Sequence, residues 1–304
     1  MTVADLHRAY RDELLAHGLL ISMGVDGLYG RSGAFEAVVE GINRAVGAVG
    51  DADKPEVMRF PPGIGKWQLE QSGYLKSSPQ LVGTVHSFTG SDVDHRAMLD
   101  SLAKGEDWTE GQRSTEVALA PAACYGVYPA IGGRGRMPGE GALVDCYTYC
   151  FRHEPSVDPA RMQLFRMREY VRAGTPDQVQ AFRAQWLERA KELIAKLGLP
   201  FDVVPANDPF FGRAGKMMKL SQREQGLKLE MVIPVANAQP TACLSFNYHQ
   251  DHFASTWGVR LADGSLAHTG CVGFGLERLA LALFKHHGLD VQGWPSGVRG
   301  LLWG

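Results

Sequence analysis

Six strand-like segments, most of them joined by loops, constrain the fold of this chain more than any other feature. They are rich in β-branched, aromatic and other apolar residues and comprise residues 142–151, 162–171, 201–205, 228–235, 242–248 and 254–261. Strands that follow one another with few helices between them favour antiparallel pairing, because a parallel pair needs a crossover connection that is usually helical. The sequence therefore predicts an α+β fold built on an antiparallel sheet.

Three amphipathic segments predict helices that flank this sheet. Residues 2–17 end at a glycine, and Ser32 is a candidate N-cap for a second helix that ends near Gly50. The clearest helix spans residues 175–198, where an initial threonine and a glutamine three residues later form a capping box. Because no repeat, low-complexity tract or linker interrupts the chain, we expect residues 1–304 to form a single domain.

The composition sets limits on location and partners. The 304 residues are 45% hydrophobic and 21% charged, as in ordinary globular proteins, and no apolar run approaches the roughly 20 residues of a membrane span. The charged N-terminus has no apolar signal-peptide core, and five sparse cysteines fit a reducing compartment, so we expect a cytoplasmic protein without membrane contact. A formal net charge of −2 argues against a surface built for nucleic acid, although it leaves room for a local basic patch.

Charged and aromatic side chains share faces of one hairpin-like stretch, CFRHEPSVDPARMQLFRMREYVRAG. Arg152 and Glu154 are two residues apart before the bend. After it, Arg161, Phe165 and Glu169 follow at intervals that keep them on one face of a strand. The set suits a nucleotide, with the arginines on phosphates, Glu154 accepting from an adenine amino group and Phe165 under the base. The alternative is a surface hairpin with cross-strand ion pairs and one packed phenylalanine.

A second stretch, GCVGFGLERLALALFKHHG, predicts a strand end, a Gly-x-Gly turn and a helix. Gly273 and Gly275 allow close approach to the backbone, and Arg278 falls in the first turn of the helix. Free backbone amides and the positive end of the helix dipole favour an anion at this place. The alternative is that Arg278 is a surface residue of a helix whose leucines belong to the core.

In this order, Phe-Arg-x-Glu, Arg-xxx-Phe-xxx-Glu and Gly-x-Gly-x-x-Arg resemble motifs 2 and 3 of class II aminoacyl-tRNA synthetases. The resemblance implies a class II synthetase-like antiparallel β-sheet flanked by helices, in a homodimer. It implies catalytic roles for Arg152, on the α-phosphate and the carboxylate of the amino-acid substrate, and for Arg278, which joins Arg161 on the terminal phosphates. Motif 1 is less distinct, and Pro61 and Pro62 are its best candidates. The implied ATP-binding residues are Arg152, Glu154, Arg161, Met162, Phe165, Ala242, Cys243, Leu244, Ser245 and Arg278.

Within this class, KLEMVIPVANAQPTACLSFNYHQDHF resembles a strand pair of seryl-type enzymes, in which a segment matching residues 242–245 helps to hold ATP. The acidic residue expected at the start of that segment is absent, which leaves the Mg²⁺ ligand open, with Glu230 as a substitute candidate. Atypical, methanogen-type seryl enzymes bind the substrate α-amino group through a Cys-Glu-Cys zinc. The resemblance thus implies one Zn²⁺ per chain on Cys124, Glu169 and Cys271, with Glu169 also facing the amino acid. Buried inert cysteines are the alternative, which we expect for the other three.

We expect no tRNA-binding domain, because the chain begins almost at the catalytic core. This combination resembles the amino acid:[carrier protein] ligases, truncated relatives of the atypical seryl enzymes. The resemblance implies ATP-dependent activation of glycine or alanine and transfer to the phosphopantetheine thiol of an acyl-carrier-type protein. The basic segment 213–228, with Arg213, Lys216 and Lys219, is a candidate docking site for an acidic carrier, or else a solvated surface connection. Two other functions stay open: a minimal seryl-type synthetase that charges tRNA, and a non-catalytic paralogue.

Overall fold

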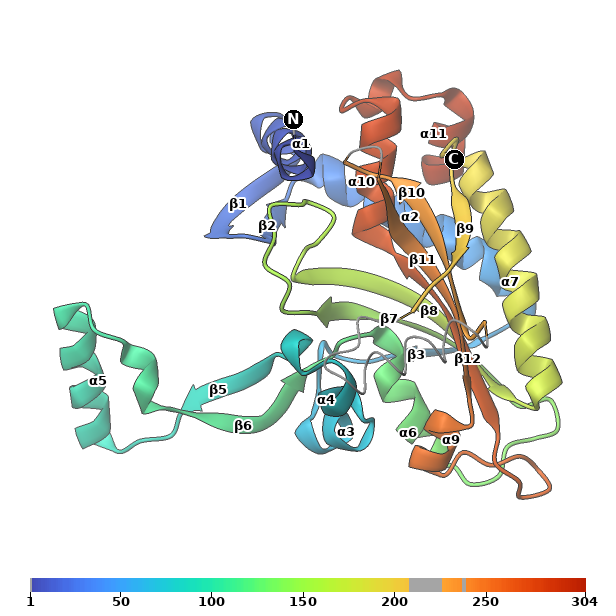
Figure 1. Ribbon diagram of the computed structural model, residues 1–304, viewed down its shortest axis with the longest axis horizontal. Coiled ribbons are helices and arrows are strands. Elements are labelled where there is room, and N and C mark those ends of the chain that lie inside the picture. The colour runs from blue at the N-terminus through green and yellow to red at the C-terminus, as the bar shows by residue number, and fades with distance from the viewer. Residues whose placement is uncertain (1, 208–225, 237–238) are drawn as a thin grey trace.

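The computed structural model describes residues 2–207, 226–236 and 239–304. Its centre is a seven-stranded sheet (Figure 1), in the order β3 (Glu56–Arg59), β7 (Ala142–Phe151), β8 (Leu164–Gly174), β12 (His268–Gly275), β11 (Pro240–Gln250), β10 (Lys228–Pro234) and β9 (Asp202–Pro205). Neighbouring strands are antiparallel except β3 and β7, which run parallel. The predicted α+β fold with an antiparallel sheet is confirmed, with one parallel pair added at the edge.

The larger hydrophobic core lies between one face of this sheet and a layer of helices (Figure 1). The predicted caps are present, because Ser32 accepts from the Phe35 amide at the start of the second helix and Thr175 and Gln178 form a capping box. Side chains such as Phe35, Trp186 and Phe284 fill the space over the strands. The helices of this layer are α1 (Val3–Ala16), α2 (Gly33–Gly50), α7 (Pro176–Lys196), α10 (Leu276–His287) and α11 (Ser296–Trp303).

A smaller core covers the opposite face of β7, β8 and β12, beneath the short helices α6 (Val127–Gly132) and α9 (His252–Trp257). Helix α9 corrects the prediction of a strand at residues 254–261. The chain reverses at Gln250, which has a φ of 55°, and the Ser255 amide then donates to the Asp251 carbonyl at 2.7 Å, closing a helical turn. Gly258, with a φ of 69°, ends that helix in the left-handed region that suits glycine.

The segment between β3 and β7 forms a second sheet that the sequence patterns did not predict. Its strands lie in the order β4 (Gly63–Gly65), β6 (Gln112–Leu119) and β5 (Thr84–Phe88). Figure 1 shows β5, β6 and helix α5 (Asp92–Lys104) extending away from the rest of the molecule. Two further short helices, α3 (Lys66–Gln71) and α4 (Tyr74–Ser77), follow β4, and a small hairpin of β1 (Leu20–Val25) and β2 (Leu28–Arg31) precedes α2.

Within the described part of the chain, no helix combines the length and the apolar character that crossing a membrane requires.

Candidate active site

A cleft opens where β8, β10, β11 and β12 meet the start of α10. Most of the side chains that the sequence assigned to ATP line this cleft, and Glu230, the substitute Mg²⁺ candidate, lies among them. Glu230 also forms an ion pair with Lys228 at 3.3 Å. The predicted ATP-binding residues that the cleft brings together are Arg152, Met162, Phe165, Ala242, Cys243, Leu244, Ser245 and Arg278.

Arg152 lies in a loop and not on a strand, because β7 ends at Phe151 and β8 begins only at Leu164. The expectation that a regular strand places Arg152 and Glu154 on one face is therefore wrong, as is the early strand start at residue 162. The loop nevertheless puts Arg152 over the aromatic ring, with its guanidinium carbon 5.5 Å from the Phe165 centroid. Its Nε donates to the Pro121 carbonyl at 3.1 Å, which fixes the direction of the side chain.

Glu154 and Arg161 are not among the residues that line the cleft, although both act electrostatically on Arg278. Nη1 of Arg161 is 3.4 Å from Oε1 of Glu154, and a second, longer contact of 3.8 Å reaches Asp158. Half of the Arg161 side chain is exposed. The structure thus brings these two residues together at the rim of the site, and their contacts with ATP stay predictions.

Arg278 is held at the entrance of α10 by two backbone carbonyls. Its Nε donates to Ala160 and its Nη1 to Ala242, both at 2.8 Å, so the guanidinium links the motif 2 loop to β11. Burial lowers the pKa of Arg278 from its usual value, because the charged form loses hydration. A cation that is desolvated in this way and fixed in the cleft lining is well placed to meet an anionic ligand.

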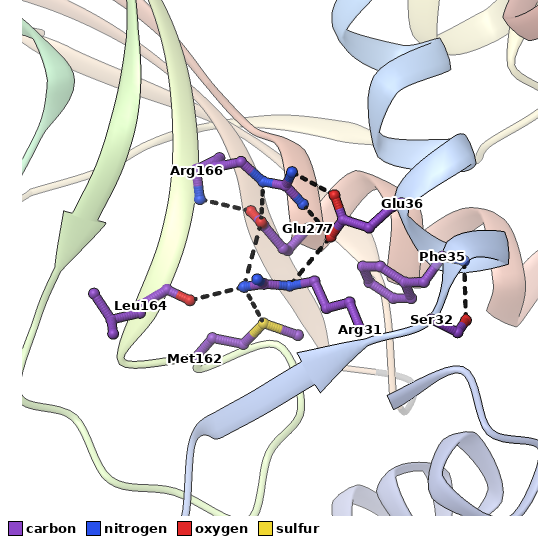
Figure 2. Close-up of polar contacts among 8 residues, drawn as sticks. All are labelled: Arg31, Ser32, Phe35, Glu36, Met162, Leu164, Arg166 and Glu277. Atoms are coloured by element: carbon purple, nitrogen blue, oxygen red, sulfur yellow. Dashed lines mark hydrogen bonds and ion pairs between the residues drawn. The ribbon is translucent and has the colours of Figure 1, made fainter. Parts of the chain in front are cut away.

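Behind the cleft, a network of buried and partly buried ion pairs joins β2, α2, β8 and α10 (Figure 2). Glu277, which precedes Arg278, accepts from both the backbone N and Nε of Arg166 at 2.7 Å. Arg166 also donates to both carboxylate oxygens of Glu36 at 2.6 and 2.7 Å. Although burial by itself lowers the pKa of Arg166, the Glu36 and Glu277 carboxylates outweigh that effect and raise it.

Arg31 completes this network from the N-terminal hairpin. Its Nη2 donates to the Leu164 carbonyl at 2.9 Å and approaches Glu277 Oε1 at 3.4 Å and the Met162 sulfur at 3.6 Å (Figure 2). Sequence reasoning missed Arg31, Glu36 and Arg166, because alternation marks Arg166 only as a residue on the face of β8 away from Phe165. The network holds the first turn of α10, and with it Arg278, against the sheet.

Three further predicted residues meet in the smaller core. The ligand atoms of Cys124, Glu169 and Cys271 all lie within 4.8 Å of one another, and all three residues are buried. Oε1 of Glu169 accepts from the amides of Ala123 at 2.7 Å and Cys124 at 3.2 Å, which orients the carboxylate. Hydrogen bonding with Cys271 and burial raise the pKa of Cys124, so a cation is needed to hold both sulfurs as thiolates. Two sulfurs and a carboxylate form a donor set that suits zinc.

Gly273 lies between this triad and the cleft. A Cβ at Gly273 would lie 3.3 Å from the Ser245 hydroxyl and 3.5 Å from Cγ of Glu169, so a side chain there would fill the space between them. Ser245 lines the cleft and Glu169 belongs to the triad. The two parts of the site therefore lie on either side of this glycine.

The remaining predicted residues divide into two groups. Cys146 and Cys150 are fully buried in the smaller core, as expected, whereas Cys243 is both buried and part of the cleft lining. The proposed carrier-docking residues Arg213, Lys216 and Lys219 lie outside the described residues.

Comparisons with known proteins identify relatives of two kinds. Amino acid–[acyl-carrier-protein] ligase 1 of Bradyrhizobium diazoefficiens is 47% identical over 289 residues, which cover 95% of this chain and 88% of the relative. Ligase 2 of the same organism is 48% identical over 95% of this chain and 86% of its own length. The type-2 serine–tRNA ligase of Methanopyrus kandleri is 26% identical over 62% of this chain and 38% of that protein.

Solved structures agree on the fold. The M. kandleri seryl-tRNA synthetase in complex with A. aeolicus tRNASec superposes with a TM-score of 0.82 at 21% identity, covering 96% of this chain. The cytoplasmic serine–tRNA ligase of Naegleria fowleri in complex with AMP gives a TM-score of 0.71 at 12% identity. The chain spans 59% of the length of each of these structures. A scan against protein-family models found no match.

These findings confirm the predicted resemblance to class II seryl-type synthetases at the level of the fold. Identity of 47% across nearly the whole chain is far above what a shared fold alone requires. The protein is a ligase and belongs to the amino acid–[acyl-carrier-protein] ligase family.

Proposed function

We propose that this ligase activates glycine or alanine with ATP and transfers the aminoacyl group to the phosphopantetheine thiol of an acyl-carrier-type protein. The observation that carries the proposal is the adjacency of the arginine-lined cleft and the Cys-Glu-Cys triad on either side of Gly273. ATP in the cleft and an amino acid at the triad would meet beside this glycine. The AMP complex of the N. fowleri enzyme, which shares the fold, supports a nucleotide in the cleft.

In the first step, a carboxylate oxygen of the amino acid attacks the α-phosphorus of ATP. The new P–O bond forms as the bond to pyrophosphate breaks, and pyrophosphate leaves with the electron pair. Arg152, held by the Pro121 carbonyl, would neutralise charge at the α-phosphate, while Arg278 would face the terminal phosphates together with Mg²⁺. Stacking of the adenine on Phe165 would orient the base.

We further propose that Cys124, Glu169 and Cys271 hold one zinc ion. Zinc bound there would offer its fourth coordination position to the substrate α-amino group. The backbone amides of Ala123 and Cys124 keep the Glu169 carboxylate turned toward the two sulfurs. The buried Tyr128, which stacks on Phe253 with ring centroids 4.2 Å apart, is expected to exclude a long substrate side chain beside the triad. Since a pocket discriminates one methyl group by only about 1–3 kcal/mol, both glycine and alanine fit the proposal.

In the second step, the phosphopantetheine thiol gives its proton to solvent and its sulfur attacks the carbonyl carbon of the adenylate. The S–C bond forms as the C–O bond to AMP breaks, which yields a thioester and AMP. The enzyme contributes mainly by positioning, for which docking of an acidic carrier on Arg213, Lys216 and Lys219 is our proposal. We also propose that the enzyme is a cytoplasmic homodimer that does not act on tRNA.

Pyrophosphate exchange with a panel of amino acids tests the first step, and acceptor assays with pantetheinylated carrier and with purified tRNA test the second. We expect exchange with glycine or alanine and transfer to the carrier alone. Efficient charging of tRNA without transfer to any carrier would establish the minimal synthetase instead. Replacement of Arg213 and Lys216 by glutamate should weaken transfer and its salt dependence while leaving exchange unchanged.

A further inference from the structure

A histidine that no sequence motif singled out contacts the metal triad. Nε2 of His249, near the end of β11, lies 3.7 Å from the sulfur of Cys271. Asn247, two residues earlier and thus on the same face of the strand, donates its Nδ2–H to the same sulfur at 3.3 Å. Two side-chain nitrogens of β11 therefore converge on one of the three proposed ligands.

The other nitrogen of the His249 ring faces hydroxyl groups. Nδ1 lies 3.2 Å from Oγ1 of Thr269 and 3.5 Å from the Tyr128 hydroxyl, both of which can donate a hydrogen bond to it. When Nδ1 accepts, the proton of the neutral ring is on Nε2, and that N–H points at the Cys271 sulfur. The arrangement accommodates the tautomer that can donate to a thiolate.

Aromatic packing fixes the orientation of this ring. His249 meets Phe253 edge-on, with centroids 5.0 Å apart and an interplanar angle of 84°. Phe253 stacks in turn on Tyr128, which is fully buried. Rotation of the His249 ring would disturb its edge-on contact with Phe253, so its Nε2 is held toward the triad.

We propose that His249 is a positioning residue whose Nε2–H hydrogen-bonds to the Cys271 thiolate and thereby sets how firmly the triad holds its metal and the substrate amino group. This proposal rests on the zinc site of the proposed function. Two thiolates and a carboxylate bring three negative charges to a divalent cation, and an N–H donor disperses part of that charge. Outer partners of this kind orient a ligand and commonly change metal affinity about 10–100-fold.

The test compares three variants of the full-length enzyme. His249→Ala removes the N–H donor, and His249→Gln keeps a side-chain amide N–H that can reach the same sulfur. His252→Ala is the matched control, because its ring also packs on Phe253, at 4.9 Å, but turns its Nε2 toward the Ser72 carbonyl. The readouts are zinc per chain, zinc affinity by competition with a chelator, and the KM values for glycine and for ATP in pyrophosphate exchange.

We expect His249→Ala to lower zinc affinity by about 10–100-fold and to raise the KM for glycine while the KM for ATP is unchanged. His249→Gln should recover most of both losses, and His252→Ala should match the wild type. Wild-type zinc affinity and glycine KM in His249→Ala would overturn the proposal while leaving the zinc site intact. Equal losses in the alanine and glutamine variants would overturn it too. If the wild type holds no metal, both the proposed zinc site and the proposed role of His249 are wrong.

Discussion

The two ends of the proposed site are built from different chemistry. At the proposed nucleotide end, charged side chains from β2, α2, β8 and α10 form a network of buried and partly buried ion pairs behind the cleft (Figure 2). At the other end, Cys124, Glu169 and Cys271 lie in a hydrophobic core and are held by backbone amides, aromatic rings and weak hydrogen bonds to sulfur. The difference fits the two proposed ligands. Polyanionic ATP is bound best by cations on a rigid support, whereas an amino group is bound best by a desolvated metal ion that accepts its electron pair.

The largest expected effect is the loss of the metal in Cys124→Ser. Removal of one sulfur leaves a two-ligand site, so we expect zinc to fall from about one atom per chain to a small fraction of that value, with glycine-dependent exchange falling in parallel. Cys150→Ser, the same change in another buried cysteine of the same core, should keep its zinc. Elemental analysis of both variants is the measurement. A metal-free wild type with full activity would contradict the proposal that one end of the site binds zinc.

Arg166→Met tests the ion-pair end. The substitution removes the charged partner that lies 2.7 Å from Glu277, which is 2% exposed, and leaves it only the backbone amide of residue 166 and the longer contact from Arg31. Removing one partner of a buried ion pair costs about 3–5 kcal/mol of unfolding free energy. Urea unfolding measures this cost. Adding Glu277→Gln to Arg166→Met should restore part of it, because the orphaned charge is then gone. If the double variant is no more stable than the single one, the network is not held by charge.

Arg152→Ala tests the chemistry at the nucleotide end. Loss of one fixed donor to the developing charge should slow pyrophosphate exchange by about 10²–10³, or about 3–4 kcal/mol. Arg134→Ala is the control, since this half-exposed side chain pairs with Glu56, neither residue lines the cleft, and its loss should matter far less. Zinc content should be normal in both variants. Undiminished exchange in Arg152→Ala would sink the assignment of this cleft.

The smallest effect is expected for Arg31→Ala. The lost hydrogen bond to the Leu164 carbonyl should cost about 1–3 kcal/mol of stability, and looser packing beside Met162 should raise the KM for ATP but not for glycine. Arg44→Ala provides the comparison, because it also removes a 2.9 Å bond to a backbone carbonyl, that of Leu302, but far from the cleft. Equal KM values for ATP in the two variants would mean that Arg31 is purely structural.

Local signals in the sequence predicted helices α1, α2, α7 and α10 and most strands of the central sheet. Ser32 and Thr175 start α2 and α7 as their capping chemistry predicts, and β7 spans the same residues, 142–151, that alternation and β-propensity mark. These features depend on neighbours within a few residues, so the sequence states them directly. The strand predicted at 254–261 is wrong, because the apolar pattern reveals neither the turn at Gln250 nor the helical hydrogen bond from Ser255 to Asp251.

Two kinds of information locate the site: sequence motifs and the order of the strands in the sheet. Resemblance to class II motifs assigned Arg152 and Arg278 to one ligand, and Cys124, Glu169 and Cys271 to another, although spacing alone was uninformative. What brings the triad together is strand order, since β12 lies beside β8 and pairs Gly273 with Glu169.

The sequence by itself determined the local elements and the chemical types available to the site. Only the tertiary structure decided that Arg31, Glu36, Arg166 and Glu277 form one network and that His249 directs a nitrogen toward Cys271. These partners come from distant elements, and their side-chain directions follow from the pairing of β8 with β12 and of β12 with β11. Contacts of this kind form only when the strands pair and the helices pack on the sheet, because no local preference encodes the distance between two atoms that are far apart along the chain.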